Sequence, residues 1–69
     1  MNIKSKVGRR IKEIRQIKDM SQKDLAYTSD IDRSYIASVE SGKRNISIVN
    51  LEKIAVALEV SLSEFFKGI

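Results

Sequence analysis

The sequence predicts an all-α fold, a single domain of five short helices spanning residues 1–69. Apolar residues recur at intervals of three and four, serine or aspartate stands before most of these stretches as a helix N-cap would, and the chain contains no proline. A chain of 69 residues buries only about 60% of the surface that its unfolded form exposes. Because Cys and His are absent, disulfides are excluded and a structural zinc is not expected, which leaves oligomerisation as the common supplement to this marginal core.

The first predicted helix follows directly after the N-terminus. Its apolar residues fall within an arc of about 120° on a helix of 3.6 residues per turn: Ile3, Val7, Ile11, Ile14 and Ile17. We expect them to form one buried stripe. The remaining residues are mostly basic and are expected to form a solvated face, with Lys4, Lys6, Arg9, Lys12 and Lys18 among them.

A second helix is predicted to begin at Gln22. Ser21 before it can accept hydrogen bonds from backbone N–H groups while Asp24 reaches back, which makes a capping box with aspartate in place of glutamate. The polar run at residues 28–30 ends this helix after roughly two turns.

A third helix is predicted over residues 33–41. Asp32 is expected to be its N-cap, and Gly42 can supply the left-handed residue that closes it. Two apolar residues three positions apart, Ile36 and Val39, lie on one face of this helix and are expected to face inward.

Two further helices complete the chain. Ser47 is expected to cap a fourth helix, and Ser61 with Glu64 forms a capping box for a short fifth helix. Their apolar residues are Leu51, Ile54, Ala55 and Leu58 in the fourth helix, and Leu62, Phe65 and Phe66 in the fifth.

The second and third helices together predict a helix-turn-helix over about residues 22–41. Ala26 is small enough to let the third helix approach closely, and Ile31 is expected to fill the junction between them. The outer face and the N-terminal end of the third helix then carry Arg33, Ser34, Tyr35, Ala37 and Ser38. Such a helix can enter a DNA major groove about 12 Å wide with its first residues on the base edges.

Residues 21–60 resemble the lambda-repressor and Cro type of helix-turn-helix domain, on the strength of Gln22, Ala26 and Gly42. Within that family, the segment DRSYIASVESGKRNIS in so short a chain most resembles the controller proteins of restriction–modification systems. The position that is usually glycine in the turn is Asp30 here. Aspartate tolerates the left-handed conformation better than most residues, so we expect the turn to be kept.

The resemblance implies roles for individual residues. The base-reading residues would be Arg33, Ser34, Tyr35 and Ser38, and the phosphate-binding residues Gln22, Lys43, Arg44 and Asn45. Arg15 and Glu40 match the positions of a buried ion pair with a structural role. Arg33 could instead contact phosphate or only solvent, Tyr35 could be a packing aromatic, and the loop at residues 43–45 could be no more than solvated.

Charge is distributed unevenly along the chain. Residues 1–44 hold 11 Lys and Arg against 6 Asp and Glu, whereas residues 45–69 hold 2 against 3. A regional positive charge suits a surface that binds a polyanion, although a solvated helix face gives the same count.

The C-terminal residues are more apolar than five short helices need to bury. We expect one ring of the Phe65 and Phe66 pair to complete the core and the other to join a two-fold dimer patch. The residues predicted for that patch are Val49, Leu62, Phe65 and Ile69, with Val56 as a further candidate. The expected partners are a second copy of the chain and double-stranded operator DNA, which a homodimer would read at two half-sites.

No enzyme is expected, because no His, Cys or glycine-rich phosphate loop is present and no serine has a partner set for activation. No cofactor, metal, small-molecule ligand or membrane contact is expected either, and the chain is expected to be cytoplasmic, since it has neither a signal peptide nor a membrane span. The sequence leaves open whether the regulator blocks or recruits RNA polymerase. It also leaves open a phage or mobile-element repressor and, in a different class, an antitoxin-like protein-interaction module.

Overall fold

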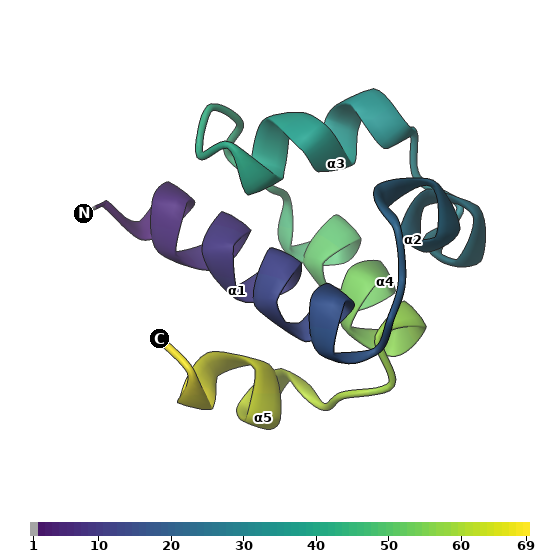
Figure 1. Cartoon of the computed structure of the whole chain (residues 1–69). Helices are drawn as coiled ribbons and strands as arrows, with labels where there is room; N and C mark the ends of the chain where they lie inside the picture. Colours follow the sequence, from purple (N-terminus) through teal and green to yellow (C-terminus); the bar gives the residue numbers. More distant parts are fainter. Residues whose placement is uncertain (1) are drawn as a thin grey trace.

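The computed structural model describes residues 2–69, and five helices account for its regular structure: α1 (Ile3–Ile17), α2 (Gln22–Ser29), α3 (Arg33–Glu40), α4 (Ile48–Ala57) and α5 (Leu62–Lys67). The all-α prediction is confirmed, and each predicted helix is present. In Figure 1, α1 runs through the middle of the molecule, with α3 on one side of it and α5 on the other. Contacts join α1 to α3, α2 to α3 and α4, and α4 to α5.

One hydrophobic core lies between the helices, and all five contribute to it. Its buried apolar residues are Val7, Ile11, Ile14, Leu25, Ile31, Ile36, Val39, Leu51, Ile54, Ala55, Leu58 and Phe65. Ile31 occupies the junction of α2 and α3, as predicted. These side chains fix how α3 sits on the rest of the molecule.

The buried stripe predicted for α1 is wrong at both ends. Ile3 is 60% exposed and Ile17 is 73% exposed, so only the middle of the stripe reaches the core. The reason is length. A helix of 15 residues spans about 22 Å, whereas α3, which covers it, has 8 residues and spans about 12 Å.

Serine side chains begin three of the helices. The hydroxyl groups of Ser21, Ser47 and Ser61 accept hydrogen bonds from the N–H groups three residues later, at 2.9–3.1 Å. At α2 the predicted capping box is complete, because the Asp24 carboxylate accepts from the Ser21 N–H at 3.0 Å. At α5 only the Ser61 bond is present in the part of the chain that the structure describes.

Asp32 stands at the N-cap position of α3 but makes no side-chain capping bond, so that prediction is wrong in its chemistry. The first turn of α3 therefore has N–H groups that no capping side chain satisfies.

Four helices end in the same way. In each, a residue with positive φ is followed by one whose N–H donates to the carbonyl five residues earlier, which is a Schellman motif. The left-handed residues are Asp19 (φ 58°), Asp30 (φ 57°), Gly42 (φ 79°) and Glu59 (φ 60°). The left-handed turn expected at Asp30 is confirmed.

Candidate nucleic-acid interface

The polar face of α3 is the exposed part of the helix-turn-helix. Ile36 and Val39 are buried, and they hold the opposite side of α3 against the core. Arg33 and Ser34 are consequently exposed at the N-terminal end of the helix, and Ser38 is half-buried one turn further on. Periodicity had predicted this division because apolar residues three apart fix one face of an eight-residue helix.

A buried ion pair fixes the far end of α3 to α1. The Arg15 guanidinium donates from Nε to Glu40 Oε2 at 2.8 Å and from Nη2 to Glu40 Oε1 at 3.0 Å. Nη1 donates to the Met20 carbonyl oxygen at 2.8 Å, so all three guanidinium nitrogens are used. The hydrogen bonds to Glu40 raise the pKa of Arg15, although burial opposes this, so the guanidinium stays charged.

Gln22 joins the same network. Its Nε2 donates to Glu40 Oε1 at 3.1 Å, which links the first turn of α2 to the last turn of α3. The structure therefore shows Gln22 bracing α3. A phosphate contact by Gln22 stays a prediction.

Tyr35 faces the loop after α3 rather than open solvent. Its hydroxyl accepts a hydrogen bond from the Ser47 N–H at 3.3 Å, and the Arg44 guanidinium carbon lies 4.7 Å from the centre of its ring. Burial by itself raises the pKa of Tyr35, but hydrogen bonds from Asn50 and Ser47 and the charge of Arg44 outweigh it, so the pKa lies below its ordinary value of 10.0. Tyr35 thus holds the basic loop against α3.

The three residues of the basic loop lie in different surroundings. Lys43, Arg44 and Asn45 are all exposed, and the N–H groups of Lys43 and Arg44 donate to the Ser38 carbonyl oxygen at 3.0 and 3.3 Å. The structure brings Arg44 to Tyr35, next to the outer face of α3. Asn45 instead lines an apolar pocket with residues of α1 and α5, so it is not shown beside the base-reading residues.

A polar depression beside α3 contains residues that the sequence did not single out. It is lined by Asp30, Ile31, Asp32, Ser34, Tyr35, Arg44, Asn50 and Lys53. Asn50 and Lys53 lie three positions apart on α4, at the border of the buried face to which Leu51 and Ile54 belong. The spacing of these two polar residues can be read from the sequence. The sequence does not show that this side of α4 would lie beside α3.

The C-terminal apolar residues divide differently from the prediction. Phe65 is fully buried, so its assignment to the dimer patch is wrong, and the exposed ring is that of Phe66, at 42%. The two rings meet edge to face, with centroids 5.2 Å apart. Val49 and Ile69 are exposed as predicted, whereas Leu62 is half-buried and packs against the core.

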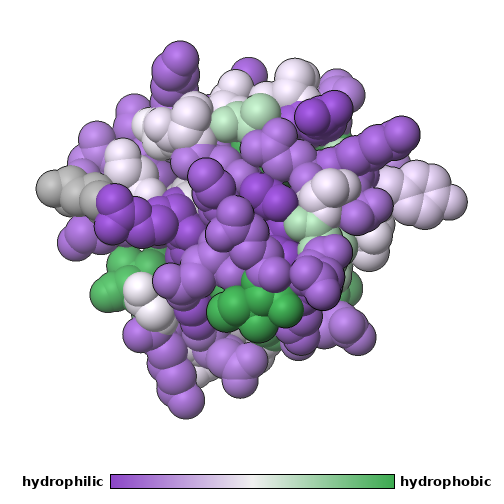
Figure 2. Space-filling view, in the orientation of Figure 1, coloured by the Kyte–Doolittle hydropathy of each residue, from purple (hydrophilic) through white to green (hydrophobic). Residues whose placement is uncertain are grey.

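Phe66 also lines a pocket of about 160 Å³ with Ile3, Lys4, Val7, Asn45, Ile46 and Leu51. The face of the molecule shown in Figure 2 is mainly hydrophilic, and its hydrophobic residues appear as small separate areas.

Within residues 2–69, no group of three His, Cys, Asp or Glu side chains is placed to hold a metal ion. No helix in this range is long and apolar enough to cross a membrane.

Residues 11–65 match the helix-turn-helix family. Over 69 residues the chain is 48% identical to the control protein C.MunI of a Mycoplasma species, covering 99% of this chain and 93% of that protein. It is 45% identical to the control protein C.BamHI of Bacillus amyloliquefaciens over 60 residues, or 86% of this chain and 74% of that one. An immunity repressor of the Bacillus phage phi105 is 40% identical over 57 residues, which are 83% of this chain and 40% of the repressor.

Solved structures of controller proteins are similar to this chain as well. The restriction–modification controller protein C.Esp1396I, as a tetramer in complex with its natural 35 base-pair operator, superposes with a TM-score of 0.91 and 48% identity over 97% of this chain and 88% of that chain. The controller C.AhdI from Aeromonas hydrophila gives a TM-score of 0.88 and 46% identity over 91% of this chain and 96% of its own. The chain therefore belongs to the helix-turn-helix family of regulators that includes the restriction–modification controller proteins.

Proposed function

We propose that this chain is the controller of a restriction–modification system, a transcriptional regulator that binds its operator as a homodimer. The observation that carries the proposal is the exposed polar face of α3, with Arg33 and Ser34 at its N-terminal end and the opposite face anchored in the core. Bound to the operator, the dimer blocks or recruits RNA polymerase according to where the operator lies.

The residue roles follow from position on α3 and the loop. Arg33 and Ser34 reach base edges first, and Ser38 follows one turn later. Lys43 and Arg44 bind phosphates, because two exposed cations at the end of α3 suit the backbone that flanks a major groove. Tyr35 positions Arg44 for that contact.

The related controllers support this assignment. C.Esp1396I has been solved on its operator, and in other structures of it an arginine, a threonine and a tyrosine at three consecutive positions are replaced singly. In this chain, Arg33-Ser34-Tyr35 is the run of the same kind.

We assign the dimer surface to Val49, Leu62, Phe66 and Ile69, with Phe66 in place of the buried Phe65. Three of these are exposed apolar side chains on α4, on α5 and just beyond it, and Leu62 is half-buried on α5. A patch that is exposed on both copies is self-complementary about a two-fold axis. The pair of α3 helices would then meet half-sites roughly 34–36 Å apart.

Selection of bound duplexes from a random pool tests the proposal, followed by footprinting of the enriched sequence. We expect an inverted repeat with half-site centres about 10 base pairs apart. Arg33→Ala should lose about tenfold or more of the preference for that sequence, as expected for a base contact. Lys12→Ala, which removes one charge from the exposed side of α1, should leave the preference unchanged. Binding that depends on salt but prefers no sequence would contradict the proposal.

A phage repressor is the second candidate, and the match to the phi105 immunity repressor favours it. The genes beside the coding sequence distinguish the two. A neighbouring endonuclease and methyltransferase pair supports the controller, and a block of phage genes supports the repressor. An antitoxin-like interaction module would instead keep its function when Arg33 is replaced.

A further inference from the structure

One guanidinium ties α5 to α1. Arg10 donates from Nε to the Phe65 carbonyl oxygen at 2.7 Å and from Nη2 to the Glu64 carbonyl oxygen at 3.0 Å, and its Nη1 pairs with Glu13. The Arg10 side chain is only 15% exposed. The bonds to α5 join residues more than 50 positions apart in the sequence, so they close the two ends of the fold against each other.

The two carbonyl groups need such a donor. They lie in the last turns of a six-residue helix, where carbonyl groups lack intrahelical partners. A helix this short is not stable by itself, and Phe65 is its one fully buried residue. A cation at the helix C-terminus makes charge-assisted hydrogen bonds and interacts favourably with the helix dipole. Arg10 therefore fixes the direction of α5.

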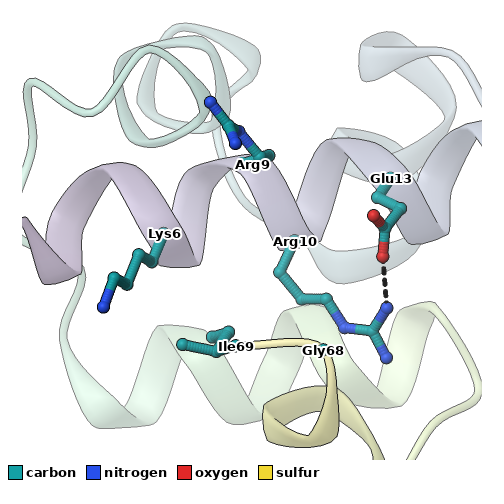
Figure 3. Close-up of a pocket in the computed structure, with 6 residues that line it drawn as sticks. All are labelled: Lys6, Arg9, Arg10, Glu13, Gly68 and Ile69. Carbon is teal, nitrogen blue, oxygen red and sulfur yellow. Dashed lines mark hydrogen bonds and ion pairs between the residues drawn. The ribbon is translucent and has the colours of Figure 1, made fainter. Parts of the chain in front are cut away.

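Gly68 closes over the same guanidinium. A Cβ built on Gly68 would stand 2.5 Å from Arg10 Nε, so a larger residue there requires the guanidinium to move. The φ angle of Gly68 is −87°, which any residue adopts, so the requirement is for space. Figure 3 shows Arg10 pointing from α1 toward Gly68, with Ile69 next to it, whereas Arg9 points away from α5.

We propose that Arg10 is a positioning residue for self-association, an inference that rests on the proposed homodimer. The Phe65 carbonyl bonded to Arg10 precedes Phe66, and Gly68 packed on the guanidinium precedes Ile69. Arg10 thus contacts the residue directly before each of the two exposed apolar residues of the C-terminal segment. Without it, these side chains lose the fixed arrangement that a two-fold contact requires.

Sedimentation equilibrium of Arg10→Gln tests this, with Arg9→Gln as the matched control on the same helix. Loss of a charge-assisted hydrogen bond should weaken dimerisation about tenfold or more. Loss of the exposed Arg9 charge should change it by less than about twofold. Gly68→Ala should also weaken dimerisation in the natural chain, but add little to Arg10→Gln, because the crowded guanidinium is then absent.

Operator binding by two copies joined through a flexible linker separates positioning from folding. Joining raises the effective concentration, so the linked Arg10→Gln protein should regain operator affinity if its α3 is intact. Two outcomes would overturn the role of Arg10 and leave the proposed homodimer standing. They are a linked Arg10→Gln variant that still fails to bind the operator, and an Arg10→Gln protein that dimerises as well as Arg9→Gln. A natural chain that stays monomeric overturns the proposed homodimer as well.

Discussion

Gly8 lets α1 cross α3 at close range. A Cβ at this position would collide with the Val39 carbonyl oxygen and lie 3.0 Å from Glu40 Cα. The obstacle is backbone, so it cannot be relieved by rotating a side chain. The angle between α3 and α1 therefore depends on the absence of a side chain at Gly8, in addition to the Arg15–Glu40 pair.

We expect Gly8→Ala to lower the free energy of unfolding by about 1–2 kcal/mol, because overpacking against α3 outweighs the gain of roughly 1 kcal/mol in helix propensity. Urea unfolding measures this. Gln16→Ala, on the exposed side of α1, is the control and should be close to neutral. A more stable Gly8→Ala protein would show that the two helices can separate without loss.

Tyr35 provides a second prediction at the level of a single residue. Its pKa lies below 10.0 in the folded protein, so folding favours the ionised form. The resulting stabilisation is complete above the unfolded pKa and is lost as the pH falls through the folded pKa. The natural chain should therefore gain stability over Tyr35→Phe as the pH rises toward 10.0.

Absorbance titration of the phenol, with Tyr35→Phe subtracted, reports the midpoint directly. Arg44→Ala should move that midpoint upward, because it removes the cation stacked on the ring. A midpoint above 10.0 would mean that burial outweighs the hydrogen bonds of the loop.

The start of α2 is a pH-sensitive element. Hydrogen bonds from Ser21 lower the pKa of the Asp24 carboxyl below its ordinary value of 3.8. The bond from the Ser21 backbone N–H has the larger effect, and the bond from the hydroxyl has the smaller one. A lowered folded pKa means that the stabilisation is present above the unfolded pKa and lost as the pH falls through the folded one. The stability difference between the natural chain and Asp24→Asn should accordingly shrink below pH 3.8.

Thermal unfolding over a series of acidic buffers checks this prediction. Ser21→Ala, which removes the hydroxyl, should reduce the dependence on pH. A constant difference between the natural chain and Asp24→Asn would indicate that Asp24 is not part of the cap in solution.

Helix starts were easier to predict than helix ends. The serine caps at Ser21, Ser47 and Ser61 are local, because each side chain bonds an N–H three residues away. The left-handed residues at Asp19 and Glu59 carry no such signal, because neither is glycine, the residue that most often ends a helix in this conformation.

The site could be predicted only in part, and what was missed depends on distant contacts. The outer face of α3 follows from the spacing of two apolar residues, so its exposed members were predictable. The sequence could not tell which of Phe65 and Phe66 would be buried. The two are neighbours on a short helix, so the answer depends on which side of that helix faces the core. The role of Arg10 could not be predicted either, because it depends on where α5 lies relative to α1.

At the level of the whole molecule, the proposed homodimer would couple stability to assembly. The core is small, and association that involves only folded chains stabilises the folded state by mass action. We expect the unfolding temperature to rise by about 3–5 °C for each tenfold increase in protein concentration.

Phe66→Ser should abolish this dependence on concentration. Tyr27→Ser, which replaces an aromatic residue that is 89% exposed on α2, should preserve it. Differential scanning calorimetry at several concentrations measures both, and an unfolding temperature independent of concentration in the natural chain would argue against a dimer.

The left-handed helix ends also bear on how this chain has evolved. Asp19, Asp30 and Glu59 each hold a conformation that costs an ordinary residue roughly 1 kcal/mol and that glycine adopts freely. Codons for aspartate and glutamate become glycine codons through one change at the middle nucleotide. Three single-nucleotide routes to relieving backbone strain are thus open, and the natural sequence has taken none of them. The helix ends therefore retain backbone strain that single substitutions could remove.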